Sequence, residues 1–224
     1  SRGLGDVYKR QDYKLPEVMI SELGLKDQSF CPAQLLAHLQ SRSYGVDCLP
    51  CFDETLVWET LAENAQLDGL ANSFLLMLHK GAGLELHDQW LATHFSIQDH
   101  PSLGTCSTFY KINDQSGIEV DKQPLIKSEK RVGNGSFEQL FATSAYHEGR
   151  LFSTLLKRIL ARSGDFDELG EWTSIYLNLL LEHRTESSEQ PDLTQLPGDF
   201  VDCVPHNIVV TPDQELRYIA VSYT

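Results

Sequence analysis

The sequence predicts an α/β protein of mixed α+β type, and three observations support that fold class. Short apolar runs typical of buried strands occupy the first third of the chain, and short alternating segments separated by turn residues occupy the middle. Apolar residues at a period of about 3.6 dominate the last third. We therefore expect the end of an α/β sheet, followed by a small antiparallel sheet and then by helices.

The first third predicts two strands and two helices. The apolar residues of 17–21 favour a short strand. Pro32 suits the first turn of a helix whose leucines follow at helical spacing, and Asp53 suits the N-cap of a second helix. A nearly continuous apolar run then predicts a strand, with Phe74 to Met77 buried on both faces.

The middle of the chain predicts a domain boundary and a small sheet. Residues 81–100 have mixed polarity and weak periodicity, and we expect the boundary between 92 and 93. Beyond it, the segments 105–112, 117–121 and 124–128 alternate in polarity and are separated by turn residues. These features are typical of short antiparallel strands.

A glycine-rich turn and two amphipathic helices follow. The turn from Gly133 to Gly135 precedes an expected helix at Phe137, but it lacks the spacing of a phosphate-binding loop, so a linker is the favoured interpretation. Leucines and aromatic residues mark one helix from 151 to 162 and another from Asp165. The last apolar runs predict a hairpin, residues 207–210 and 215–219, that turns through Pro212 and Asp213.

Composition excludes several classes of protein. The 224 residues include 18 basic and 32 acidic side chains, a net charge of −14 at pH 7, which repels phosphate backbones. No apolar run reaches the roughly 18 residues of a membrane helix, and no secretory segment leads the chain. We therefore expect a cytoplasmic protein with no nucleic-acid partner and no transmembrane segment. Its five cysteines are expected to be free thiols.

Both ends of the chain resemble translated sequencing adaptor. Residues 1–11 and the tail 220–224 are therefore expected to be unstructured and to pack against nothing. The native segment would then be 12–219, with native sequence missing before Asp12 and after Ile219. The alternative is a native, loosely structured N-terminal arm.

One cysteine pair has the spacing of a metal or dithiol site. Cys48 and Cys51 are separated by two residues, but a structural zinc needs four ligands and no second pair of this kind exists. Cys31 and His38 are the other ligands that could be proposed. Two incidental thiols in a loop are the favoured interpretation, so we predict no metal site there.

The stretch from Asp202 to Asn207 carries the most informative chemistry. Phosphoryl transfer needs a carboxylate that accepts the hydroxyl proton and an amide oxygen that holds Mg²⁺. Asp202 suits the catalytic role and Asn207 the metal-binding role, because they lie five residues apart on a loop that enters the hairpin. An acidic loop that merely caps the hairpin is the alternative, and the local sequence leaves both open.

A site of this kind also needs a lysine from the preceding sheet to pair with the ATP phosphates. Lys122 is the best-placed candidate for this cofactor-binding role, and Lys127 is the next. The alternative for either lysine is a solvated position on an edge strand.

The loop resembles the catalytic loop of small-molecule kinases of the aminoglycoside-phosphotransferase and protein-kinase-like group. Asp202 and Asn207 match the paired residues of that loop. Two positions depart from the pattern: Phe200 stands where these kinases usually have histidine, and Ala220 stands where a second metal-binding aspartate is expected. The departures put the completeness of the metal site in question.

Several segments together resemble a bacterial family of class I S-adenosylmethionine-dependent methyltransferases of surface-polysaccharide and O-antigen biosynthesis, in which a kinase-like region follows the methyltransferase domain. The resemblance is carried by residues 12–16 with Ser21 and Glu22, by 52–54 with Trp58, by 70–75 and by 197–207. It implies that 12–92 is the C-terminal end of the methyltransferase domain with a helical insertion. Residues 93–219 would then be a truncated kinase-like region.

The resemblance also implies cofactors and partners. S-adenosylmethionine would bind to the parent protein outside this chain, and the kinase-like region would use ATP and Mg²⁺. The expected acceptor is a glycan or lipid-linked saccharide, and polysaccharide-assembly enzymes are the expected partners. We predict that the chain is a fragment of a methyltransferase or of a bifunctional methyltransferase and kinase, without either activity on its own. The alternatives are a non-catalytic kinase-like module that binds a glycan or a partner enzyme, and an α/β domain of unknown role.

Overall fold

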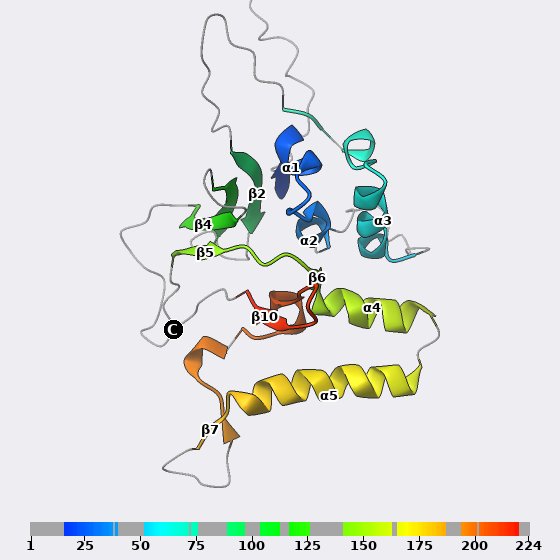
Figure 1. The fold of residues 1–224 in the computed structure, drawn as a ribbon, viewed down its shortest axis with the longest axis vertical. Helices are drawn as coiled ribbons and strands as arrows, with labels where there is room; N and C mark the ends of the chain where they lie inside the picture. Colours follow the sequence, from blue (N-terminus) through cyan, green and yellow to red (C-terminus); the bar gives the residue numbers. More distant parts are fainter. Residues whose placement is uncertain are drawn as a thin grey trace, which may run out of the picture.

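The described residues form a mixed α+β fold with two main antiparallel sheets, a third antiparallel sheet of only two strands, and several helices (Figure 1). The computed structural model describes residues 16–37, 39, 52–71, 73–75, 89–96, 104–112, 117–125, 141–162, 165–186, 194–200 and 202–219. Its mixed α+β character confirms the coarse fold class predicted from the sequence. No helix in these ranges is long and apolar enough to cross a membrane.

The larger sheet has five strands in the order β1-β2-β3-β4-β5, and every neighbouring pair is antiparallel. Threonine, valine and aromatic residues recur along its strands, as is typical of half-buried sheet surfaces. The strands are β1 (Val18–Ile20), β2 (Trp90–Ser96), β3 (Thr105–Lys111), β4 (Ile118–Pro124) and β5 (Thr143–Ala145).

Two short helices, α1 (Glu22–Lys26) and α2 (Pro32–Leu36), lie against this sheet. Ser21 begins α1, because its hydroxyl accepts a hydrogen bond from the Gly24 amide at 3.0 Å and donates one to the Trp90 carbonyl at 2.6 Å. Pro32 occupies the first turn of α2, as the sequence predicted.

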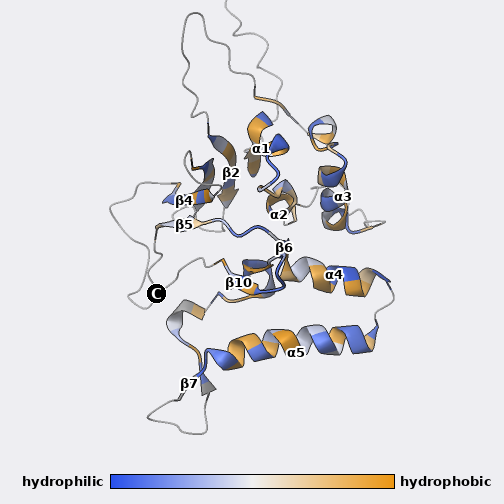
Figure 2. Cartoon of the chain, viewed as in Figure 1, coloured by the Kyte–Doolittle hydropathy of each residue, from blue (hydrophilic) through white to orange (hydrophobic). Residues whose placement is uncertain are grey.

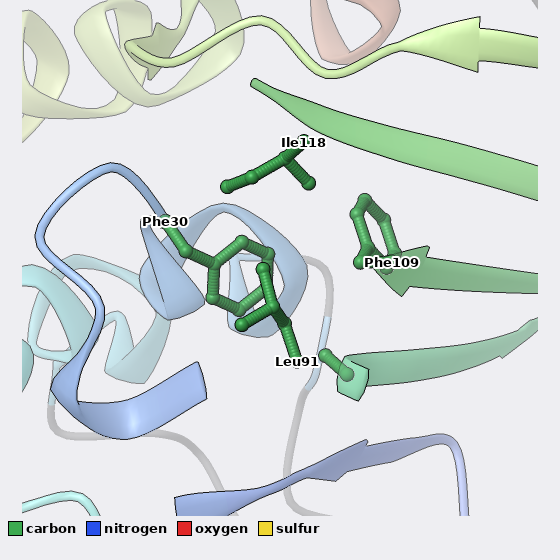
Figure 3. Close-up of a cluster of buried hydrophobic side chains, with 5 residues drawn as sticks. Phe30, Leu91, Phe109 and Ile118 are labelled. Atoms are coloured by element: carbon green, nitrogen blue, oxygen red, sulfur yellow. The ribbon is translucent and has the colours of Figure 1, made fainter. Parts of the chain in front are cut away.

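An aromatic and aliphatic core holds these helices on the sheet. Phe30 comes from the segment before α2 and packs against the sheet residues Leu91, Phe109 and Ile118 (Figure 3). The rings of Phe30 and Phe109 lie 5.6 Å apart and are tilted, a favourable geometry for aromatic pairs. Burying these side chains contributes on the order of 2 kcal/mol each.

The second half of the chain is built on two long helices, α4 (Phe152–Arg162) and α5 (Phe166–Glu182), which run antiparallel to each other (Figure 1). Figure 2 shows that hydrophobic and hydrophilic residues alternate along both helices. Phe152 stacks on Trp172 with ring centroids 4.5 Å apart, and both pack with Ile208. The two predicted helices are therefore confirmed, including Asp165 as the N-cap of α5.

A three-stranded antiparallel sheet, ordered β10-β9-β6, packs beside α4. It consists of β6 (Arg150–Leu151), β9 (Ile208–Val210) and β10 (Leu216–Tyr218), so the predicted C-terminal hairpin is confirmed. The remaining elements are the helix α3 (Trp58–Glu63), the short strands β7 (Thr185–Glu186) and β8 (Thr194–Gln195), and the 3₁₀ turns η2 (Glu54–Leu56), η3 (Asp68–Leu70), η5 (Gly198–Phe200) and η6 (Pro205–Asn207).

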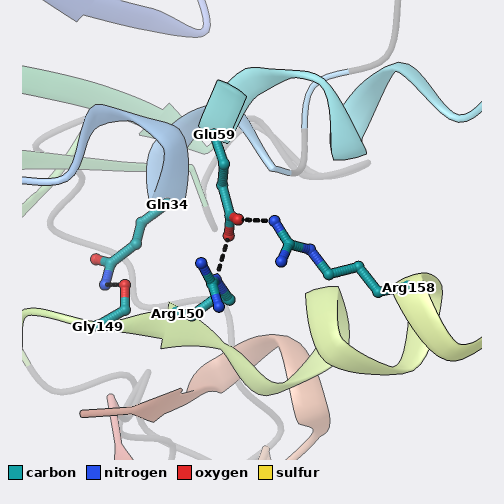
Figure 4. A network of polar contacts seen from close by, with 5 residues as sticks. All are labelled: Gln34, Glu59, Gly149, Arg150 and Arg158. Atoms are coloured by element: carbon teal, nitrogen blue, oxygen red, sulfur yellow. Dashed lines mark hydrogen bonds and ion pairs between the residues drawn. The ribbon is translucent and has the colours of Figure 1, made fainter. Parts of the chain in front are cut away.

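The linker between the two sheets is held by the N-terminal segment. The Gln34 side chain donates a hydrogen bond to the Gly149 carbonyl at 2.6 Å (Figure 4) and another to the His147 carbonyl at 3.2 Å. The Tyr146 hydroxyl accepts a hydrogen bond from the Cys31 amide at 3.0 Å. The hydroxyl of Tyr146 and the carbonyls of His147 and Gly149 thus all bond to residues 31–34. These bonds fix where the chain leaves the larger sheet.

A second set of contacts joins α3 to the start of the helical half. Glu59 forms ion pairs with Arg150, at 3.0 Å, and with Arg158 (Figure 4). Nearby, the Lys157 ammonium donates to the Thr55 hydroxyl at 2.8 Å. Asp53 accepts a hydrogen bond from the Thr55 amide, so it caps η2, the turn that leads into α3.

Several sequence expectations need correction. Phe74 and Leu75 are 71% and 67% exposed and form no strand, because an apolar run becomes a strand only where a neighbour supplies hydrogen bonds. The strand at 18–20 pairs antiparallel with β2 and so belongs to the five-stranded sheet rather than to a separate α/β sheet. The strand expected at 117–121 is β4, which continues to Pro124. Residues 126–128 of the strand expected at 124–128 lie outside the described ranges.

The expected domain boundary between 92 and 93 falls inside β2, whose neighbour β1 comes from the first segment. The larger sheet therefore draws strands from both sides of that boundary. Other expectations concern residues outside the described ranges. These are both adaptor-like ends, Met77, Cys48, Cys51, Lys127, the turn at 133–135 and Phe137.

Candidate functional site

A row of polar side chains crosses one face of the five-stranded sheet. Lys122 on β4 pairs with Ser107 on β3, and Ser107 pairs with His94 on β2. Residues directly opposite each other on antiparallel strands point to the same face of the sheet. His94, Ser107 and Lys122 therefore form a continuous row over three strands.

The neighbouring row on the same face is apolar. It lies two residues further along each strand and contains Ala92, Phe109 and Val120. These residues belong to the core that Phe30 covers. The polar row thus begins where the apolar packing of α1 and α2 against the sheet ends.

The loop that carries the predicted catalytic residues is built by local hydrogen bonds. The Asn207 side-chain amide donates to the Asp202 carbonyl at 2.9 Å, and the Cys203 amide donates to the Phe200 carbonyl at 3.0 Å. The Tyr176 hydroxyl of α5 donates to the Cys203 carbonyl at 2.8 Å. The loop is therefore fixed to the helical half, with Asp202 and Asn207 held together.

Lys122 lies on β4 and Asp202 lies on the loop between η5 and η6, and the two interact electrostatically. Lys122 is half-buried, and burial lowers the pKa of its ammonium group to about 8, while the negative charge of Asp202 opposes that shift. The Asp202 charge thus acts on Lys122, although no ion pair or hydrogen bond joins the two side chains among the described residues.

Asn207 offers the chemistry expected of a metal ligand. Its amide nitrogen is used in the bond to the Asp202 backbone, and its amide oxygen is the atom that suits a hard cation such as Mg²⁺. Within the described ranges, no group of three or more histidine, cysteine, aspartate or glutamate side chains could hold a metal ion.

Sequence reasoning missed His94. It assigned this region to a boundary because the periodicity of 81–100 is weak, whereas His94 lies on β2 between two other strands. Burial lowers the pKa of His94 and the positive charge of Lys122 lowers it further, whereas Glu17 raises it. Ala92, His94 and Ser96 are every second residue of this segment, a spacing that places them on one face of a strand. Only the register, however, shows that His94 shares a row with Lys122.

The described cysteines do not form a second reactive site. Cys31, Cys106 and Cys203 are free thiols. Burial raises the pKa of Cys203, and the charge of Asp202 raises it further. Because the thiolate is the nucleophilic form, Cys203 is a poor candidate for covalent chemistry.

Comparisons of the chain with protein-family models, with curated proteins and with solved structures find no match. The geometry of the described residues is therefore the basis for the functional argument.

Proposed function

We propose that this chain carries a kinase-like site that binds ATP between the row containing Lys122 and the loop containing Asp202 and Asn207. The observation that supports it best is the register that places Lys122 in one row with Ser107 and His94, and the charge of Asp202 acts on the half-buried ammonium of Lys122. A lysine on a strand and an aspartate on a loop, with a carboxamide beside the aspartate, match the parts that phosphoryl transfer requires.

Each residue has a distinct role in this proposal. The Lys122 ammonium binds phosphate oxygens as a point charge. The Asp202 carboxylate accepts the proton of the acceptor hydroxyl, and the Asn207 amide oxygen helps to hold Mg²⁺. The magnesium ion would neutralise charge that develops on the transferring phosphoryl group.

The wider assignment rests on the sequence resemblance. In that proposal the parent protein is a methyltransferase of bacterial polysaccharide biosynthesis, the acceptor is a glycan or lipid-linked saccharide, and S-adenosylmethionine binds outside this chain. A cytoplasmic location belongs to the same proposal. The described residues support the kinase-like part, because the polar row and the loop provide its proposed residues.

Binding of MgATP, measured by isothermal titration calorimetry, tests the proposed site. We expect Lys122→Met to weaken binding at least tenfold, because an ammonium that pairs with phosphate is lost. The exposed Lys26 provides a matched control, and Lys26→Met should leave the affinity unchanged. Equal affinity in the wild type and Lys122→Met, or no binding to either, would exclude the proposed site.

A non-catalytic module that binds a glycan or partner enzyme is the second candidate. Phe200 favours it, because it stands where the kinase pattern has a histidine. Turnover of MgATP separates the two candidates. A catalytic site should gain measurable turnover in Ala220→Asp and lose it again when Asp202→Ala is added, whereas a non-catalytic module should show no turnover in any variant.

A further inference from the structure

We infer that His94 is a further phosphate-binding residue, which together with Ser107 and Lys122 contacts the polyphosphate chain of the nucleotide. The inference rests on the proposed function and deepens it, because it names the residues that would distinguish an extended polyphosphate from a single phosphate. Its basis is the register of the five-stranded sheet.

The row places three polar side chains on adjacent strands. His94 pairs with Ser107, and Ser107 pairs with Lys122, so the three side chains lie on one face at successive strand positions. Neighbouring strands are about 4.8 Å apart, and the row therefore spans roughly 10 Å from β2 to β4. Donors distributed over that length suit a chain of linked phosphates better than a compact single phosphate.

The apolar row beside it fixes where a ligand could lie. Ala92 and Phe109 are buried under Phe30, so that part of the face is occupied by protein. His94 and Lys122 lie beyond this packing and are half-buried. The negative charge of Asp202 acts on Lys122 there. A phosphate chain along the polar row would therefore point towards the loop that carries the proposed base.

The charges that face His94 define its protonation. Glu17 lies beside it at the start of β1, where the Glu17 carbonyl accepts a hydrogen bond from the Phe95 amide at 2.8 Å. Lys122 contributes a positive charge from β4, and Ser107 between them is neutral. Burial and the charge of Lys122 both lower the pKa of His94, and together they outweigh the opposite effect of the Glu17 carboxylate. The imidazole is thus largely neutral at pH 7 and has one N–H group that could donate to a phosphate oxygen.

Binding of a polyphosphate to such a group is linked to protons. The negative charge of the ligand favours the imidazolium form, so it raises the pKa of His94 in the complex. The complex then binds more protons than the free protein, and affinity increases as pH falls through this range. A purely structural histidine would not produce this dependence.

Calorimetry with defined probes tests the inference. MgATP, tripolyphosphate and adenosine are titrated into the wild type, His94→Gln and the control His183→Gln, whose histidine is exposed on the C-terminal end of α5. We expect His94→Gln to weaken MgATP and tripolyphosphate binding about fivefold at pH 6, less at pH 8, and to leave any adenosine binding unchanged. His183→Gln should keep the pH dependence of the wild type.

A second measurement keeps the inference testable if His94→Gln does not fold. The imidazole of His94 is titrated by NMR in the wild type, with and without tripolyphosphate, and its pKa should rise when the ligand binds. Failure of the wild type to bind either phosphate probe would overturn the proposed function itself. Loss of binding in Lys122→Met, with unchanged affinity and pH dependence in His94→Gln, would overturn only the role of His94.

Discussion

Lys122 is a lysine whose surroundings disfavour its charged form. Burial lowers its pKa from the usual 10.5 to about 8, although Asp202 offsets part of the shift. A group with these properties reduces the stability of the folded protein at neutral pH, because the ammonium is better solvated in the unfolded chain. Such a residue is more typical of a functional site than of a structural one.

We predict a specific pH dependence for Lys122→Met. Between about pH 8 and pH 10.5 the unfolded wild type binds more protons than the folded protein, so Lys122 makes the wild type more stable as the pH rises. Lys122→Met lacks this contribution. Its free energy of unfolding, measured in urea, should therefore exceed that of the wild type most at pH 7, with the difference shrinking towards pH 10.

The pKa of His94, which the charge of Lys122 lowers, lies below its usual 6.5, so between pH 7 and pH 10 the difference between the two unfolding curves mainly reports Lys122. A constant difference from pH 7 to pH 10 would show that Lys122 has an ordinary pKa.

The contact between α1 and β2 depends on a glycine. A methyl group at Gly24 would lie 2.2 Å from the Leu91 carbonyl oxygen, which is too close for any real contact. Gly170 in α5 has open space, so there an added methyl group only restricts the unfolded chain and favours the helix.

We predict opposite effects for two glycine-to-alanine substitutions within helices. Gly24→Ala should lower the free energy of unfolding by more than about 2 kcal/mol, because backbone must move. Gly170→Ala should raise it by about 1 kcal/mol. Urea unfolding of both variants checks the prediction, and a neutral Gly24→Ala would show that α1 does not approach β2 as closely as described.

Elements that depend on local pattern could be predicted from the sequence. The stripes of α4 and α5, the cap at Asp165 and the final hairpin follow from residues close together in the chain. The segment with Phe74 and Leu75 was wrongly predicted to form a strand, because apolar content does not specify a pairing partner. Whether such a segment forms a strand depends on its pairing with residues that are far away in the sequence.

The candidate site was predictable only in part for the same reason. Asp202 and Asn207 lie in one short motif, and their hydrogen bond joins residues five positions apart. Lys122 could be named because it directly follows the strand predicted at 117–121. His94 could not, because its relation to Lys122 depends on the pairing of β2 with β3 and of β3 with β4.

At the scale of the whole molecule, the linker contacts and the ion pairs of Glu59 hold the two halves together. Gln34 binds the backbone between the two sheets, and Glu59 connects α3 to Arg150 and Arg158 (Figure 4). These contacts position the face of the larger sheet relative to the loop at 198–207. The action of the Asp202 charge on Lys122 depends on this placement, and the proposed function uses both residues.

The most direct test of this arrangement is an NMR titration of the Lys122 side chain in the wild type and in Asp202→Asn. The structure predicts a pKa of about 8 in the wild type, because Lys122 is half-buried. It predicts a still lower pKa in Asp202→Asn, since the charge that favours the ammonium form is removed. A pKa near 10.5 that is the same in both proteins would contradict the claim that these residues share one site.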